Sequence, residues 1–194
     1  PLGGDFDQTF QDTTLQKESW EKAEAQLQKE AVAQALSKAG ARPEEVDFIL
    51  AGDLLNQCIS STFGLMGFGI PFLGQYGACS TMAQTLLLAS ILVESGAARK
   101  ALAVTSSHFC SAERQFRLPL EYGGQRPPTA QWTATAAGCV LVGEGGKVQV
   151  RRGLAGRIQD LGVKDPANMG AAMAPAAADS IYQFLEDTHT TPQD

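Results

Sequence analysis

Apolar residues spaced three to four positions apart over residues 19–39 predict the first helix of the chain. Gly40 is placed to end this helix, and Pro43 prevents it from continuing. Residues 1–17 are polar and show no clear period, so they are expected to form a loop. The charged side of the helix is interpreted as facing solvent, and it comprises Glu21, Lys22, Glu24, Lys29 and Glu30.

Short continuous apolar runs predict the strands of a sheet. They lie at residues 46–52, 70–76 and 100–105, and the lack of polar alternation is typical of strands covered on both faces. A short helix is predicted between the first two, over residues 60–67. The order strand, helix, strand, helix, strand predicts an α/β fold with a mostly parallel sheet, right-handed crossovers and helices on both faces.

The most apolar helix pattern covers residues 82–94 and contains a single charge. Because it has no polar side, we expect this central helix to be buried on nearly every face. Ser80 or Thr81 is placed to cap its first turn. Cys79 is then expected inside the fold at the positive end of the helix dipole, a setting that stabilises a thiolate and attracts anions. Cysteine is also a common small core residue, so the pattern alone leaves both roles open.

Beyond the third strand the pattern becomes less regular. Residues 106–131 form a long excursion, and a loop of this length is usually functional or flexible. A fourth strand is predicted over residues 132–142. After a turn at 144–146, residues 147–154 alternate in polarity and are expected to pair back as a further strand.

The last helix pattern, over residues 169–187, resembles the first one. When Pro192 is aligned with Pro43, several apolar positions of the two helices coincide, which indicates an internal repeat. We therefore divide the chain into residues 1–154, one α/β half, and residues 155–194, a connector and the first helix of an incomplete second half.

Composition excludes some classes of protein. The 194 residues suffice for one domain with a core, and the net charge of −6 with a pI near 4.9 argues against a nucleic-acid partner. No run reaches the roughly 20 apolar residues that a membrane helix needs. The four cysteines show neither zinc-site nor redox-pair spacing, so we expect reduced thiols in an intracellular protein and no metal site.

Three chemically active segments follow the carboxyl ends of predicted strands. They are Asp53, Cys79 and the run at 106–108. Ligands of open α/β sheets bind at this end of the strands, so we predict one shared site.

Several long and unusual strings carry a resemblance to a known family. They are AGDLLNQ (51–57), IPFL (70–73), GACS (77–80), TSSH (105–108), AERQFR (112–117), EYGGQ (121–125) and MGAAMAPAAAD (169–179). With them the chain resembles the stage V sporulation protein AD family of spore-forming bacteria. That family is similar in fold to the thiolases and ketoacyl-ACP synthases, so the resemblance implies a thiolase-like fold.

The resemblance implies a binding role and no catalysis. The expected ligand is dipicolinic acid (pyridine-2,6-dicarboxylate), alone or as its calcium chelate, which is taken up into the developing spore. The expected partners are membrane proteins of the stage V sporulation A operon, and no cofactor is expected. The protein is expected to be cytoplasmic to peripheral on the spore inner membrane, and to form a homodimer through the strand near residues 70–76.

Five ligand-binding residues follow from the resemblance. Cys79 takes the position of the superfamily's nucleophile, and Asp53, Ser107, His108 and Arg114 belong to motifs near the same pocket. A helix N-terminus, hydroxyls and an arginine suit a small dianion. Asp53 suits a protonated ring nitrogen or calcium better. Two alternatives stay open: an acyl transferase that uses Cys79, and a structural scaffold of the spore membrane complex.

Overall fold

The computed structural model describes residues 3–116, 132–165 and 168–193. The chain forms two compact units, Pro1–Lys147 and Val148–Asp194. The loop predicted at 106–131 lies largely outside the described residues, and its described beginning is helical.

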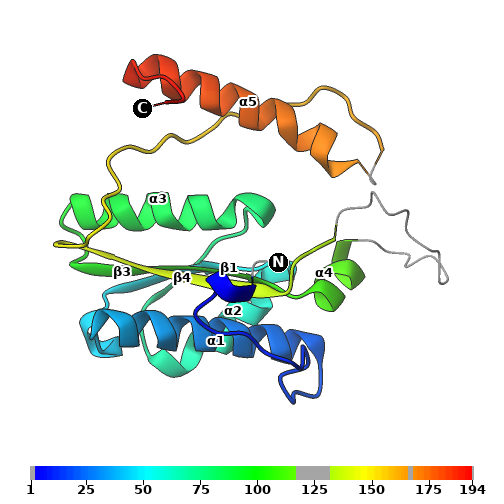
Figure 1. Cartoon of the computed structure of the whole chain (residues 1–194), viewed down its shortest axis with the longest axis vertical. Coiled ribbons are helices and arrows are strands. Elements are labelled where there is room, and N and C mark those ends of the chain that lie inside the picture. The colour runs from blue at the N-terminus through cyan, green and yellow to red at the C-terminus, as the bar shows by residue number, and fades with distance from the viewer. Residues whose placement is uncertain (1–2, 117–131, 166–167, 194) are drawn as a thin grey trace. The chain divides into compact units, whose positions relative to one another are not determined.

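Four strands of the first unit form one sheet (Figure 1). They are β1 (Phe48–Gly52), β2 (Phe72–Gly74), β3 (Lys100–Ser107) and β4 (Ala136–Gly143). Their order is β2-β1-β3-β4; β1 pairs in parallel with β2 and β3, and β4 pairs antiparallel with β3. The predicted α/β fold with a mostly parallel sheet is confirmed.

Helices cover both faces of this sheet. In Figure 1, α1 (Trp20–Ala39) and α2 (Ile59–Leu65) lie on one face and α3 (Thr81–Glu94) on the other, while α4 (Phe109–Phe116) follows β3. The Ser19 side chain caps α1, and Gly40 ends it with a φ of 60°. Short 3₁₀ helices lie at Gly3–Asp5, Pro43–Glu45, Asn56–Cys58, Met66–Phe68 and Ala78–Ser80.

Side chains alternate along the strands and make two cores. Ile49 and Leu102 point to the α1 side, where they join a buried cluster with Val32 and Leu36 of α1. Leu50 points the other way and packs with a second cluster under α3. β1 and β3 are apolar on both sides because each side is covered, as their continuous runs predicted, whereas the residues of β2 are exposed.

Helix α3 is not buried on every face, so that part of the prediction is wrong. Thr81, Thr85 and Ala89 are buried against the sheet, at a spacing of one helical turn. On the far side, Ala83 is exposed and Ile91 retains 51% of its side-chain exposure. One turn-spaced stripe is enough to pack a helix on a sheet, and no described residue of the first unit covers Ala83 or Ile91 fully.

The further strand predicted at residues 147–154 is also wrong, because this described segment has no regular structure. Alternating polarity stabilises a strand only where one side is covered, and Val148 is 89% exposed.

The second unit consists of an extended segment and helix α5 (Met169–Thr188), which confirms the last predicted helix. Asn168 caps it through its side chain, and His189 ends it in the left-handed conformation. Arg157 donates to the Gln183 side chain (2.8 Å), tying the extended segment to the helix. Among the described helices of the chain, none has the length and apolar character needed to cross a membrane.

Candidate functional site

The carboxyl end of β1 and the start of α3 touch at one edge of the sheet. A Cβ atom on Gly52 would lie 2.0 Å from the Gln75 carbonyl oxygen and 2.7 Å from the Thr81 methyl group, so only glycine permits this approach. Asp53 follows Gly52 directly, and Cys79 stands two residues before Thr81. The contact therefore brings the Asp53 and Cys79 segments together, as the topology predicted.

Cys79 lies in a tight turn directly before α3. The turn is the 3₁₀ helix Ala78–Ser80, and Ala78 adopts a positive φ of 48°. Strain of this kind is concentrated at functional positions. Cys79 is exposed and does not lie inside the fold as predicted, because the turn projects beyond the sheet edge.

The first turn of α3 keeps its backbone N–H groups free of a side-chain cap. Ser80 is the cap residue, but its hydroxyl donates to the Gly77 carbonyl (2.8 Å) and not to the helix. The predicted Thr81 alternative also fails, since its hydroxyl accepts from the Gly77 N–H (3.2 Å). An uncapped helix start beside an exposed thiol is suited to anion binding.

Asp53 is buried, with 1% of its surface exposed, and both of its carboxylate oxygens are in use. One oxygen accepts from the Leu55 N–H (2.9 Å). The other accepts from the Ser61 N–H (2.8 Å) and the Ser61 hydroxyl (2.6 Å). In this arrangement the carboxylate organises the loop between β1 and α2.

His108 is buried at the turn between β3 and α4, with 1% exposure. Its Nε2 lies 2.9 Å from the Thr13 carbonyl oxygen, and its Nδ1 accepts from the Cys110 N–H (3.2 Å). A carbonyl only accepts, so Nε2 carries the proton and both ring nitrogens are occupied. Neighbouring Ser107 is half-buried and donates to the Ala134 carbonyl (2.6 Å).

Arg114 extends from α4 toward α1, where it forms an ion pair with Glu21. The Arg114 side chain is 52% exposed, so solvent screens this pair.

Helix α1 contributes a buried polar network that the sequence analysis missed. Glu24 and Gln28 are both 0% exposed, although Glu24 was predicted to face solvent; that prediction is wrong. Glu24 accepts from the hydroxyls of Ser106 (2.9 Å) and Ser111 (2.7 Å). The Gln28 amide nitrogen donates to Ser106 and Ser61 (2.8 Å each), and to the Gly52 carbonyl at 3.3 Å. The signal in the sequence is the spacing of four residues, which puts both side chains on one face of α1.

The network carries an unusual carboxyl group. Burial raises the pKa of Glu24 from 4.5 to about 7, and the charge of Asp53 acts in the same direction. Hydrogen bonds from Ser111 and Ser106 lower the pKa but only partly offset the burial. Glu24 therefore changes charge near neutral pH.

Two of the other thiols, those of Cys58 and Cys139, are poorly suited to nucleophilic chemistry. All four cysteines are free. Burial raises the pKa of Cys58, and it raises the pKa of Cys139 to about 12. Among the residues that the structure describes, no cluster of three metal-ligating side chains occurs.

A groove of about 780 Å³ lies between the N-terminal segment, α1 and β4. Its wall includes Phe6, Phe10 and Leu141, and none of the five predicted ligand-binding residues lines it. The predicted ligand-binding residues therefore lie outside this groove.

Comparison with known proteins decides the family. The profile of the family described as Stage V sporulation protein AD (SpoVAD) matches residues 1–194, the whole chain. The chain belongs to this family. Stage V sporulation protein AD of Bacillus subtilis (strain 168) is 47% identical over 195 residues, which cover 100% of this chain and 58% of the relative. The chain therefore spans 58% of the length of that sporulation protein.

Solved structures support the fold. The tetronic acid condensing enzyme AbyA1 matches 86% of this chain and 58% of its own, with a TM-score of 0.63 and 21% identity. The 3-oxoacyl-[acyl-carrier-protein] synthase III of Aquifex aeolicus VF5 matches 66% of this chain and 40% of its own, with a TM-score of 0.49 and 21% identity. At this identity the likeness to AbyA1 shows a shared thiolase-like fold and does not extend to activity.

Proposed function

We propose that this chain carries the site at which a Stage V sporulation protein AD binds dipicolinic acid, or its calcium chelate, without catalysis, for uptake into the developing spore. The supporting observation is the exposed Cys79 turn at the uncapped start of α3, held against the end of β1. Family membership supports the sporulation role.

The distribution of charge in the chain favours this edge of the sheet as the binding site for a dianion. The chain carries a formal −6, so an anion needs a local positive region. The start of α3 supplies backbone N–H groups and the positive end of a helix dipole. Arg114 adds a half-exposed guanidinium, for which a dianion would compete with the Glu21 carboxylate.

The five predicted residues divide into two roles in this proposal. Cys79, Ser107 and Arg114 reach the surface, and we expect them to contact the ligand. Asp53 and His108 are buried with their polar atoms in use, so they shape the edge from within. Asp53 holds the loop after β1, and His108 fixes the turn after β3.

Calorimetry with dipicolinate, with and without calcium, tests the proposal. A charge-assisted arginine contact contributes roughly 1.5–3 kcal/mol, so Arg114→Ala should weaken binding by about 10- to 100-fold. Cys79→Ser should have a smaller effect, because the sulfur needs only to fit. Arg99→Ala is the matched control, since Arg99 faces Asp47 at the opposite end of the strands. No saturable binding to the wild type, or equal effects of Arg114→Ala and Arg99→Ala, would count against it.

An acyl transferase that uses Cys79 is the second candidate, since the thiol is exposed and the AbyA1 fold neighbour is named as an enzyme. Both nitrogens of His108 are engaged, so this side chain is not poised as a base for Cys79. Covalent labelling of Cys79 by a reactive acyl-CoA analogue would favour the enzyme.

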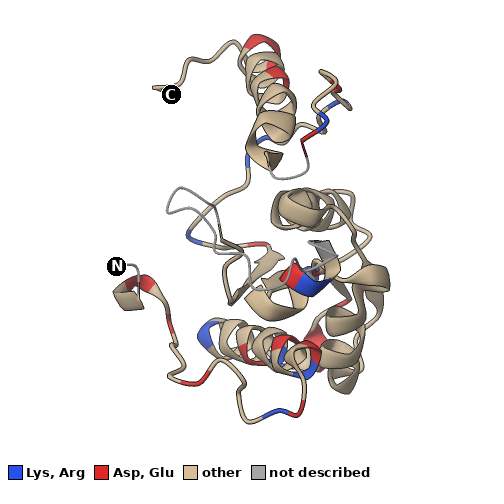
Figure 2. Ribbon diagram, turned by 90° about the vertical axis from the view of Figure 1, so that its right-hand side faces the viewer, with Lys and Arg blue, Asp and Glu red and all other residues tan. Residues whose placement is uncertain are grey.

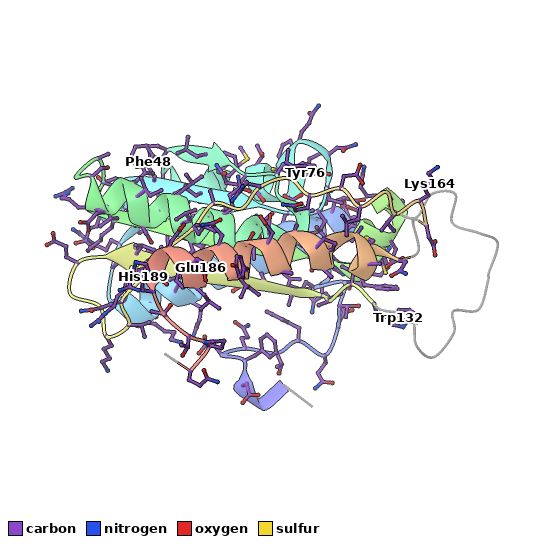
Figure 3. All side chains as sticks on the ribbon, turned by 90° about the horizontal axis from the view of Figure 1, so that it is seen from above. Phe48, Tyr76, Trp132, Lys164, Glu186 and His189 are labelled. Carbon is purple, nitrogen blue, oxygen red and sulfur yellow. The ribbon has the colours of Figure 1, made fainter. Side chains whose placement is uncertain are left out.

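We further propose a homodimer and a peripheral place on the spore inner membrane beside the membrane proteins of the stage V sporulation A operon. β2 is an edge strand, and Phe72, Leu73 and Phe63 expose apolar surface beside it. Figure 3 labels Tyr76, a further exposed apolar residue just beyond this strand. Light scattering of wild type and Leu73→Lys tests the dimer, which the charge should disrupt.

A further inference from the structure

Two side chains from one turn of α1 hold together the strand ends that form the candidate site. Gln28 donates to the carbonyl of Gly52, the last residue of β1, and to Ser106 near the end of β3. The two strands are neighbours in parallel register, so this bond pair bridges them at the carboxyl edge. Ser61, a third partner of Gln28, donates onward to Asp53.

Glu24 holds the turn after β3 from both sides. Its two oxygens accept from Ser106 before the turn and from Ser111 after it. The segment between these serines contains Ser107 and His108, two of the predicted site residues. Because Glu24, Ser106 and Ser111 are all buried, these bonds are shielded from competing water.

The network is not optimised for stability alone. The Gln28 carbonyl oxygen is buried and has no hydrogen-bond partner among the described residues, while the amide nitrogen serves three acceptors. Leaving a buried acceptor unpaired is costly, and natural proteins retain such costs mainly at functional sites.

We propose that Glu24 and Gln28 are positioning residues of the candidate site: they clamp the end of β1 and both flanks of the Ser107–Cys110 turn onto α1. They do not touch the ligand. The expected effect on dipicolinate affinity rests on the proposed binding function. The expected effect on amide hydrogen exchange rests on the hydrogen-bond geometry alone.

The first experiment needs no ligand. Amide hydrogen exchange of the full chain is compared between wild type, Glu24→Ala and Ser111→Ala. Exchange in the turn, where the Ala112 N–H bonds the His108 carbonyl, should be at least about tenfold faster in both variants. Ser90→Ala is the control, because it removes a similar serine bond to Leu86 in α3 on the other face of the sheet. Unchanged exchange at 107–112, or the same acceleration at every amide, would overturn the proposal.

The second experiment measures dipicolinate affinity by calorimetry. Ser111→Ala should weaken binding about tenfold, and Glu24→Gln, which keeps an acceptor of the same shape, should restore most of what Glu24→Ala loses. If the wild type binds no dipicolinate, the proposed function fails while the exchange experiment still decides the clamp. If exchange in the turn accelerates but affinity is unchanged, the clamp does not position a binding site and the proposal is overturned.

Discussion

Helices α1 and α3 cover opposite faces of one sheet. The charged helix α1 buries polar side chains, whereas the apolar helix α3 leaves apolar side chains exposed. Figure 2 shows charged residues gathered along α1, whereas α3 carries a single charge. Yet Glu24 and Gln28 of the charged helix are fully buried, while Ile91 of the apolar helix is half exposed. Polarity is therefore a poor guide to burial for these two helices.

The difference lies in what each helix faces. The network side of α1 meets Ser61 of α2 and Ser106 of β3, whose hydroxyls bond the buried Gln28 amide nitrogen and the Glu24 carboxyl group. α3 meets an apolar surface, including Leu50 and Ala103, and needs only small side chains there. A polar residue can be buried wherever partners exist, and an apolar residue stays exposed wherever no surface covers it.

The largest effect should come from removing the buried carboxyl group of α1. At pH 5, below the raised pKa of Glu24, Glu24→Ala should lower the free energy of unfolding by roughly 2–4 kcal/mol, because two buried hydroxyls lose their hydrogen-bond partner and a cavity remains. Lys29→Ala, at an exposed position on the same helix, is the control and should stay within about 0.5 kcal/mol. Urea unfolding measures the stability of both variants. Equal losses for Glu24→Ala and Lys29→Ala would mean that the Glu24 side chain is solvated and not buried.

The next effect is a pH dependence. Folding raises the pKa of Glu24 from 4.5 to about 7. Between these two pH values the folded state therefore binds more protons than the unfolded state. Stability from this group is complete below about pH 4.5 and is lost as pH rises through about 7, by on the order of 2–3 kcal/mol. Glu24→Gln should flatten this part of the profile. If the stability of Glu24→Gln fell between pH 4.5 and 7 as much as that of the wild type, another group would be responsible for the pH dependence.

On α3, the same substitution should have different effects on its two faces. Ala89 is fully buried against the sheet, so Ala89→Leu should overpack the core and cost roughly 1–3 kcal/mol. Ala83→Leu places the same side chain on the exposed face and should change little. Thermal unfolding compares the two, and a similar cost at both positions would mean that the outer face is covered in solution.

The smallest effect is expected at Ile91. Because its side chain is half exposed, Ile91→Ser should change the free energy of unfolding by no more than about 0.5 kcal/mol. Denaturant titration at low protein concentration measures this. A loss above 1.5 kcal/mol would show that a partner surface buries this residue.

The sequence by itself determined the elements and the family. Continuous apolar runs predicted β1 and β3 because both faces of each strand are covered, and the Gly40 signal marked the end of α1. Topology alone placed Asp53, Cys79 and the 106–108 run at one edge. The family motifs are local strings, so they needed no structure to be found.

Only the tertiary structure decided which polar groups are buried and which apolar groups are not. Glu24 and Gln28 gained partners from residues 24 to 87 positions away in the chain, which no local pattern encodes. Likewise, the burial of Asp53 and His108 and the exposure of Cys79 depend on how separate loops pack at the sheet edge. Local sequence sets the period of an element, whereas burial is a property of all the surfaces that meet it.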